Sequence, residues 1–307
     1  MLSKLVAILG TTASGKSHWA HKLAGRFDGE IVVADSRQVY KDFTIGTNKD
    51  IGEWEKSDGK FFYYVEGMPY HLVDIISPKE QFTVYDYQKR AFDAIDDILK
   101  RGKNPFLVGG TGMYVRAVVE NWKLAKAPSE EALRKKLNEK PKISLLTELR
   151  AIDPERAKTI DMHNKRRLVR ALEVYYLTGE TLKDSPPKGE ARYKVLKLAP
   201  LIPRDDLYRN IAKRVSNMFE KGLLEEVQKL FKEYPHDVGV FSSIGYRQFF
   251  PYFEGKATLE DVKEQIIRDT KKYARRQLTW FRKEKDLNWL STYEEAEALV
   301  LKFFKTL

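Results

Sequence analysis

Short apolar runs, each bounded by glycine, proline or charged residues, recur along the chain and predict buried strands. The first three are typical of parallel strands, and the fourth predicts a strand that returns to the same sheet. These runs are Leu5–Leu9, Glu30–Asp35, Phe106–Val108 and Val195–Ala199. Because helical patterns separate the runs, the sequence predicts an α/β fold with a parallel sheet and helices on both faces.

The clearest helical pattern runs from Val84 to Arg101. Thr83 can cap the start of this helix, and Gly102 can end it. Its apolar positions repeat at the helical period and share one face, which comprises Ala91, Ile95, Ile98 and Leu99. We therefore expect an amphipathic helix between the second and third strands.

Residues 122–192 differ from the rest because they are charged and helix-forming, without a convincing strand. Helix starts are predicted at Pro128–Glu131, Asp153–Glu155 and Asn164, where caps, proline or acids occur. In the last of these helices, which Gly179 follows, one face is expected to hold Leu168, Leu172, Tyr175 and Tyr176. The turn-rich segment Asp184–Gly189 then predicts a linker. The sequence thus predicts a core of residues 1–121 and 193–307, interrupted by a helical insertion domain at 122–192.

Composition narrows the class of protein. The chain has 307 residues, 42% of them hydrophobic, which is enough for one sizeable core and a smaller second unit. It has no run of about 18 apolar residues and no signal-peptide pattern, so we expect a cytosolic protein with no membrane segment. The absence of cysteine excludes disulfides, thiolate metal sites and a cysteine nucleophile.

The charge balance bears on the partner. Lys and Arg number 55 against 44 Asp and Glu, a net charge of +11. This excess favours a polyanionic partner such as nucleic acid, although many basic proteins have none. Between Arg268 and Lys285 the basic residues number eight and the acidic ones two. We expect an apolar stripe for core packing at Ile267, Ala274, Leu278 and Phe281, and a face suited to phosphates at Arg268, Lys272, Arg275 and Arg282.

The strongest chemical motif follows the first predicted strand. It matches G-x-x-x-x-G-K-[ST] at every fixed position and consists of Gly10, Thr11, Thr12, Ala13, Ser14, Gly15, Lys16 and Ser17. In such a P-loop, backbone N–H groups wrap a phosphate, Lys16 bridges phosphate oxygens and the Ser17 hydroxyl can hold Mg²⁺. The motif leaves open whether the ligand is a nucleotide or another diphosphate.

Asp35 ends the second predicted strand, so it should project from the same sheet edge as the P-loop. Three roles are compatible with this position. Asp35 could be a Mg²⁺ ligand, a general base for an incoming nucleophile, or a strand-end cap that binds nothing.

An ordered series of further motifs resembles the tRNA dimethylallyltransferase family over roughly Leu5 to Arg282. The matching segments are Asp35–Tyr40, Ile45–Thr47 with Lys49, His71–Ile75, Gly109–Tyr114, Arg167–Val174, Arg214 with Met218, Gly222–Glu226, Ile244–Gln248 and Arg275–Arg282. The resemblance implies a P-loop NTPase-like core with a helical insertion, which uses Mg²⁺ and dimethylallyl diphosphate to prenylate N6 of the tRNA adenosine just 3′ of the anticodon.

The resemblance also implies roles for individual residues. The P-loop would grip the diphosphate, Asp35 would be the general base, Thr111 would hydrogen-bond the oxygen that links prenyl group and diphosphate, and Arg214 would neutralise the leaving group. His71 also matches the family, but we expect it to have a structural hydrogen-bonding role rather than a catalytic one. The residues implied to contact the tRNA anticodon stem-loop are Asp35, Ser36, Arg37, Gln38, Thr111, Arg166, Arg167, Arg170, Tyr246, Arg247, Gln248, Arg275, Arg276 and Arg282.

Three alternative functions share some of these features. A P-loop small-molecule kinase would need neither the basic C-terminal face nor the insertion. An adenylate isopentenyltransferase would have the same core but little need for an extended basic surface. A non-catalytic RNA-binding protein with a vestigial P-loop would have no reason to keep Lys16, Ser17 and Asp35. We also expect a monomer without an obligate protein partner.

Overall fold

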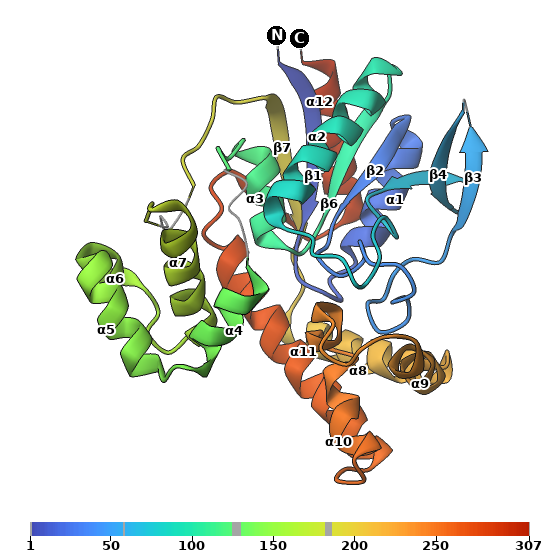
Figure 1. The fold of residues 1–307 in the computed structure, drawn as a ribbon. Helices are drawn as coiled ribbons and strands as arrows, with labels where there is room; N and C mark the ends of the chain where they lie inside the picture. The colour runs from blue at the N-terminus through green and yellow to red at the C-terminus, as the bar shows by residue number, and fades with distance from the viewer. Residues whose placement is uncertain (1, 58, 125–129, 182–185, 307) are drawn as a thin grey trace. The chain divides into compact units, whose positions relative to one another are not determined.

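The computed structural model describes residues 2–306 except 58, 125–129 and 182–185. Within these residues, one eight-stranded sheet has the order β3-β4-β5-β2-β6-β1-β7-β8 (Figure 1). The strands are β1 (Ser3–Leu9), β2 (Gly29–Ala34), β3 (Glu53–Ser57), β4 (Lys60–Val65), β5 (Met68–His71), β6 (Asn104–Gly109), β7 (Tyr193–Pro200) and β8 (Leu287–Leu290).

The centre of the sheet is parallel, which confirms the four strands predicted from apolar runs. β1 lies between β6 and β7, with Val6 paired to Phe106 on one side and to Leu196 on the other. β2 pairs in parallel with β6 and β5, and β7 pairs in parallel with β8. Because these strands are buried on both faces, continuous apolar runs encode them.

One edge of the sheet departs from the prediction. β3, β4 and β5 pair in antiparallel register, so the sheet as a whole is mixed. β3 has the sequence Glu-Trp-Glu-Lys-Ser and is exposed along almost its whole length. An edge strand of this kind has no apolar run to reveal it, and the four-residue strands β5 and β8 are too short for a recognisable period.

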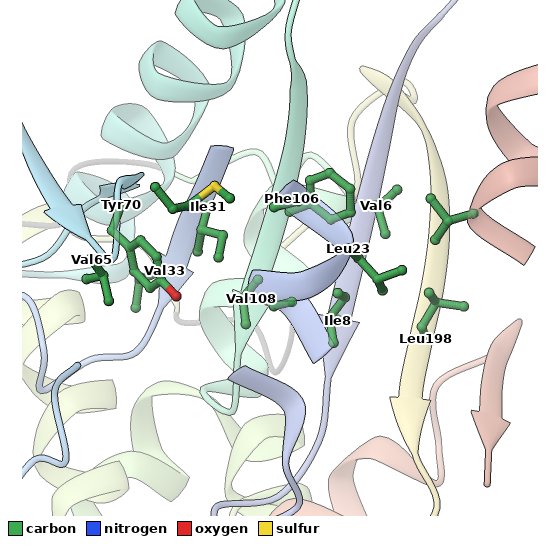
Figure 2. Close-up of a cluster of buried hydrophobic side chains, with 14 of the residues drawn as sticks. Val6, Ile8, Leu23, Ile31, Val33, Val65, Tyr70, Phe106, Val108 and Leu198 are labelled. Carbon is green, nitrogen blue, oxygen red and sulfur yellow. The ribbon is translucent and has the colours of Figure 1, made fainter. Parts of the chain in front are cut away.

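Helices cover both faces of the sheet, as predicted. Val6 and Ile8 of β1 pack in one cluster with α1 (Lys16–Arg26) and α12 (Tyr293–Lys305), which Figure 2 shows in part. The alternate residues of β1 pack in the opposite cluster, with α2 (Val84–Lys100) and α3 (Gly112–Val119). Strand periodicity therefore divides the core into two layers.

Helix α2 confirms its predicted boundaries. The Thr83 hydroxyl accepts from the Asp86 backbone N–H, and the Asp86 carboxylate accepts from the Thr83 N–H, which together form a capping box. Gly102 follows the helix with a φ of +75°, the left-handed conformation expected after a helix C-terminus. Its buried face includes Ala91, Ile95 and Ile98.

A further group of helices lies at the carboxyl edge of the central strands (Figure 1): α8 (Arg204–Glu220), α9 (Leu223–Glu233), α10 (Phe250–Phe253) and α11 (Leu259–Phe281). They enclose a third cluster around Phe43 and Tyr246. In α11 the predicted apolar stripe is buried at Ala274 and Phe281 and half-buried at Ile267 and Leu278. Thr270 and Gln277 are buried as well. The Thr270 hydroxyl donates to the Ile266 carbonyl of the same helix, and Gln277 Nε2 donates to the Gly110 carbonyl.

The chain divides into two compact units, one formed by Met1–Asn121 with Glu190–Leu307 and the other by Trp122–Gly189. The second unit contains α4 (Glu131–Glu139), α5 (Lys142–Ile152), α6 (Pro154–Thr159) and α7 (Lys165–Thr178) around an apolar core of its own. Asp153 caps α6 by accepting from the Arg156 N–H at 2.9 Å, as predicted. The predicted helix start at Pro128 and Ser129 and part of the Asp184–Gly189 linker lie outside the described residues.

The face predicted for α7 holds only in part. Leu168 and Leu172 are buried, but Tyr176 is 47% exposed and its hydroxyl lies 3.0 Å from Glu148 Oε2. The helix ends at Gly179, which adopts the left-handed conformation with a φ of +72°. Among the described helices of both units, none combines the length and hydropathy needed to cross a membrane.

Candidate active site

The P-loop connects β1 to α1 and turns sharply through left-handed residues. Gly10, Ala13 and Gly15 have φ values of +147°, +61° and +86°. Ser14 Oγ donates to the Thr11 carbonyl at 2.9 Å, and Lys16 Nζ donates to the same carbonyl at 3.3 Å. The loop is therefore wound with its lysine folded back onto it, in the geometry that surrounds a phosphate with N–H groups.

Two residues from distant parts of the chain hold Thr12 of this loop. Arg214 Nη1 of α8 donates to the Thr12 hydroxyl at 2.6 Å. Gln277 Oε1 of α11 accepts from the Thr12 N–H at 2.8 Å, and Gln277 Nε2 donates to the Gly110 carbonyl at 2.9 Å. Arg214 thus stands at the P-loop, where its predicted role requires it, and Gln277 joins the loop to the segment after β6.

Asp35 and Thr111 follow β2 and β6, which are neighbours in the sheet. Asp35 Oδ1 accepts from the N–H groups of Arg37 at 2.8 Å and Gln38 at 3.4 Å. Thr111 Oγ1 accepts from the Ser36 N–H at 3.1 Å, so the two strand ends are joined directly. The structure brings Asp35, Thr111, Arg214 and the P-loop to one edge of the sheet, the usual ligand position in open α/β folds.

A small cavity of about 40 Å³ lies beside the P-loop, and its polar lining comprises Lys16, Ser17, Asp35, Gln38, Asp50 and Tyr70. Asp50 was not among the residues singled out from sequence. It follows β2 by a long loop and precedes the exposed hairpin strand β3, in a stretch without periodicity or a motif of its own. Only the fold reveals that this carboxylate faces the P-loop lysine.

The charges around the cavity influence one another. Burial lowers the pKa of Lys16 to about 8, and the nearby Arg214 cation adds to this effect, while Asp35 and Asp50 oppose it. Burial likewise lowers the pKa of Arg214, against the pull of Asp50 and Asp35. For Asp50, burial raises the pKa while Arg214 and Lys16 lower it. Two cations and two carboxylates therefore share a site where water screens them poorly.

The loop that leads to Asp50 is held by a dense set of hydrogen bonds. The Glu226 carboxylate accepts from the N–H groups of Thr44 at 3.2 Å, Ile45 at 2.7 Å and Gly46 at 3.1 Å. It also accepts from the Tyr246 hydroxyl at 2.8 Å. Gln38 Nε2 donates to the carbonyls of two further loop residues, Thr47 and Asn48.

The buried ammonium of Lys49, next to Asp50, anchors the end of this loop. It pairs with the Asp74 carboxylate and donates to the Tyr40 carbonyl at 2.8 Å. Burial lowers the pKa of Lys49, although Asp74 opposes the shift. A buried cation that pairs with a carboxylate and donates to a carbonyl fixes the backbone that carries Asp50.

The structure corrects the roles expected of Tyr246 and Gln248. Tyr246 is fully buried with its hydroxyl on Glu226, and Gln248 is 6% exposed. Gln248 donates to Asp269 at 2.8 Å and accepts from the Gly245 N–H at 3.0 Å. Both side chains are buried and form hydrogen bonds within the protein, so they offer almost no surface for direct RNA contact. We therefore assign them to positioning the loops around the site.

The other predicted RNA contacts on this unit are more accessible. Arg275, Arg276 and Arg282 of α11 and the following turn are exposed, and Arg275 lines two surface grooves of about 450 and 700 Å³. Arg247 Nη2 forms an ion pair with Asp269 Oδ2 at 2.7 Å, and Arg37 Nη1 donates to the Gly239 carbonyl at 3.3 Å. Arg268, Lys272, Arg275 and Arg282, which form the basic face expected from the sequence, are all exposed.

In the second unit, the three predicted arginines differ in their surroundings. Arg166 and Arg167 are exposed. Arg170 donates to the buried Glu173 carboxylate at 2.7 Å, and Arg134 donates to the same carboxylate at 3.0 Å. Burial alone would raise the pKa of Glu173, but these two hydrogen bonds outweigh it and lower the pKa. Arg170 thus has a structural partner, whereas Arg166 and Arg167 present their charge to solvent.

His71 is close to a buried carboxylate, as a structural hydrogen-bonding role would require. Its Nε2 lies 2.7 Å from the buried Glu30 carboxylate, to which Arg101 also donates. Burial alone would raise the pKa of Glu30, but hydrogen bonds from Arg101 and His71 lower it to about 2.

The oxygen groups beside Lys16 are suited to Mg²⁺. Ser17 offers a hydroxyl, and Asp35 and Asp50 offer carboxylates, the hard donors that Mg²⁺ prefers. Within the described residues no three histidine, aspartate or glutamate side chains gather as a metal-binding group. This donor set fits an ion that shares its coordination with substrate phosphates and water.

A sequence model of the family described as IPP transferase matches residues 38–284. The chain belongs to the IPP transferase family. Within this family, the tRNA dimethylallyltransferase of Anoxybacillus flavithermus is 38% identical and covers 96% of this chain and 92% of its own length. The tRNA dimethylallyltransferase 2 of Geotalea uraniireducens is 40% identical, with 97% and 94% covered.

Solved structures of the family have the same fold. The full-length tRNA isopentenylpyrophosphate transferase of Bacillus halodurans has a TM-score of 0.70 and 36% identity, over 98% of this chain and 95% of its own. A eukaryotic dimethylallyltransferase acting on tRNA has a TM-score of 0.80 and 27% identity, and the match covers 98% of this chain and 79% of that protein. These similarities confirm the family resemblance and the P-loop NTPase-like fold expected from the ordered motifs.

Proposed function

We propose that the chain transfers a dimethylallyl group from dimethylallyl diphosphate to N6 of the tRNA adenosine on the 3′ side of the anticodon, which gives N6-isopentenyladenosine. The observation that carries the proposal is one juxtaposition. A P-loop with Lys16 and Arg214 at its side faces Asp35 and Thr111 across the ends of adjacent strands. Cations for a diphosphate thus stand beside a base for an amine.

The reaction makes one bond and breaks one bond. The adenine N6 attacks the first carbon of the prenyl group while the bond from that carbon to the diphosphate oxygen breaks, and the diphosphate leaves with the electron pair. Asp35 accepts the proton that N6 loses. An exocyclic amine is a weak nucleophile because its lone pair is delocalised into the ring, so drawing away its proton as the bond forms assists attack.

The diphosphate needs its developing charge balanced before it can leave. Lys16 and the P-loop N–H groups bind its oxygens, and Arg214, already placed on Thr12, adds a second cation. Thr111 Oγ1 accepts from the Ser36 N–H, which leaves its own O–H free to donate to the bridging oxygen. A Mg²⁺ ion held by Ser17 would supply further positive charge at the phosphates when bound.

RNA contacts are proposed for each of the two units separately, from charge and exposure. Arg275 and Arg276 of α11 and Arg282 directly after it are exposed in the first unit, and Arg166 and Arg167 are exposed in the second. Guanidinium groups bind phosphates with charge-assisted hydrogen bonds, so these residues fit the backbone of the anticodon stem-loop. The relatives named above carry tRNA in their own names, which supports the same partner for this chain.

One experiment separates this function from its rivals. The protein is incubated with dimethylallyl diphosphate labelled in the prenyl group, together with unmodified tRNA or with AMP, and in a parallel reaction with γ-labelled ATP. We expect label in tRNA only, and none with the Lys16→Ala variant. Comparable prenylation of AMP would favour an adenylate isopentenyltransferase, and phosphate transfer from ATP to an acceptor would favour a kinase.

A further inference from the structure

Asp50 is an acidic residue in a place where the proposed function needs positive charge. It lines the same cavity as Lys16 and Ser17, and its charge acts on both Lys16 and Arg214. A diphosphate bound to these cations would therefore have a carboxylate as its neighbour. Such a neighbour repels the ligand unless another positive charge intervenes.

The backbone that carries Asp50 is fixed on several sides. Glu226 holds Thr44, Ile45 and Gly46, and the buried Lys49 pairs with Asp74 immediately before Asp50. The backbone carbonyl of Asp50 accepts a hydrogen bond from the Tyr63 hydroxyl at 3.0 Å. The backbone on both sides of the carboxylate is thus tied to the protein core.

Among the described residues, the Asp50 carboxylate has no direct hydrogen-bond or ion-pair partner. Asp35, in contrast, already accepts from two backbone N–H groups. A half-buried carboxylate that lacks a direct partner and lines the same cavity as a serine hydroxyl has capacity to bind a cation, directly or through water.

We infer that Asp50 makes the binding of the prenyl diphosphate dependent on Mg²⁺. Without the ion, Asp50 repels the diphosphate and partly neutralises Lys16 and Arg214. With the ion, the same carboxylate attracts the Mg²⁺–diphosphate complex, so the enzyme selects the metal-bound form of its donor. This inference rests on the proposed function, since it takes the P-loop ligand to be a diphosphate.

The inference predicts effects of opposite sign under two conditions. In Asp50→Asn, dimethylallyl diphosphate should bind more tightly than in the wild type when EDTA removes Mg²⁺, because a repulsive charge is gone. In saturating Mg²⁺ the same variant should bind dimethylallyl diphosphate more weakly than the wild type, because the carboxylate that attracts the Mg²⁺–diphosphate complex is gone. We expect the ratio of the Kd without Mg²⁺ to the Kd with Mg²⁺ to fall by roughly tenfold, as for the loss of one moderately screened charge interaction.

Isothermal titration calorimetry of the full chain with dimethylallyl diphosphate alone, without tRNA, measures these constants directly and does not depend on turnover. Mn²⁺ binding in the presence of the diphosphate, followed by electron paramagnetic resonance, gives a second readout and should weaken in Asp50→Asn. Glu53→Gln is the matched control, because Glu53 is an exposed acid nearby in sequence and its loss changes the net charge equally.

The outcomes separate this inference from the proposed function. Weaker binding of Asp50→Asn in both conditions would mean a structural role and would overturn the inference, as would a wild-type affinity that does not depend on Mg²⁺. Lys16→Ala tests the proposed function in the same assay. If Lys16→Ala binds the diphosphate as well as the wild type does, the P-loop is not the diphosphate site and the proposed function itself fails.

Discussion

Replacing Glu226 by glutamine should loosen the loop that places Asp50. The Glu226 carboxylate accepts four hydrogen bonds, two on each oxygen: Oε2 accepts from the N–H groups of Thr44 and Ile45, and Oε1 accepts from the Gly46 N–H and the Tyr246 hydroxyl. A glutamine offers one acceptor oxygen and one NH₂ group. An NH₂ group in place of Oε2 would face the N–H donors of Thr44 and Ile45. An NH₂ group in place of Oε1 would face the Gly46 N–H, while the Tyr246 hydroxyl can turn to accept from it.

The magnitude follows from these contacts. A hydrogen bond to a charged group contributes about 1.5–3 kcal/mol, and a buried donor left without an acceptor costs about 1–3 kcal/mol. Part of this loss is recovered because the loop is half-buried and water can reach some of its N–H groups. We therefore expect Glu226→Gln to reduce the free energy of unfolding by about 2–4 kcal/mol. Tyr246→Phe, which removes one of the four donors, should cost about 1 kcal/mol.

Urea unfolding followed by tryptophan fluorescence measures this change, and calorimetric titration with dimethylallyl diphosphate measures its effect on the site. Glu225→Gln is the matched control, because Glu225 is an exposed neighbour on the same helix and should change stability by less than about 0.5 kcal/mol. A loss below about 1 kcal/mol for Glu226→Gln would refute the reasoning, since it would mean that the four hydrogen bonds do not hold the loop.

Three further predictions concern the site and the RNA surface. Asp35→Asn should lower kcat in single-turnover assays by roughly 10²–10⁴-fold with little change in donor affinity, and normal turnover at raised Mg²⁺ would return Asp35 to a metal-ligand role. Because the pKa of Lys16 is lowered to about 8, its charge is present below that pH and lost above it, so the calorimetric Kd for the diphosphate should rise from pH 7 to pH 9.5; a flat profile would contradict the shift. Arg275→Ala should make the salt dependence of tRNA affinity shallower by about 0.7–0.9 in log–log slope, while Lys302→Ala on α12 should leave it unchanged; equal slopes for both would place Arg275 away from the RNA.

Local patterns in the sequence determined the elements nearest to the chemistry. The P-loop is eight consecutive residues between a strand and a helix. Apolar runs and helical periodicity predict both of these elements. The cap of α2 is likewise local, because Thr83 and Asp86 bond to each other's backbone. Asp35 could be placed at the same sheet edge as the P-loop because it ends a predicted strand, whereas Thr111 was indicated only by the family resemblance. The ordered motifs then identified the family.

Only the tertiary structure decided which distant side chains complete the site. Gln277 meets the P-loop across 265 positions of sequence, and Glu226 meets its loop across about 180. Tyr246 is buried on Glu226 rather than exposed to RNA, and Asp50 faces Lys16. Periodicity and caps arise from contacts between residues a few positions apart, so they encode elements. Contacts between elements depend on how loops and helices pack together, and a hydrogen bond between a loop N–H and a remote carboxylate leaves no repeating pattern in the chain.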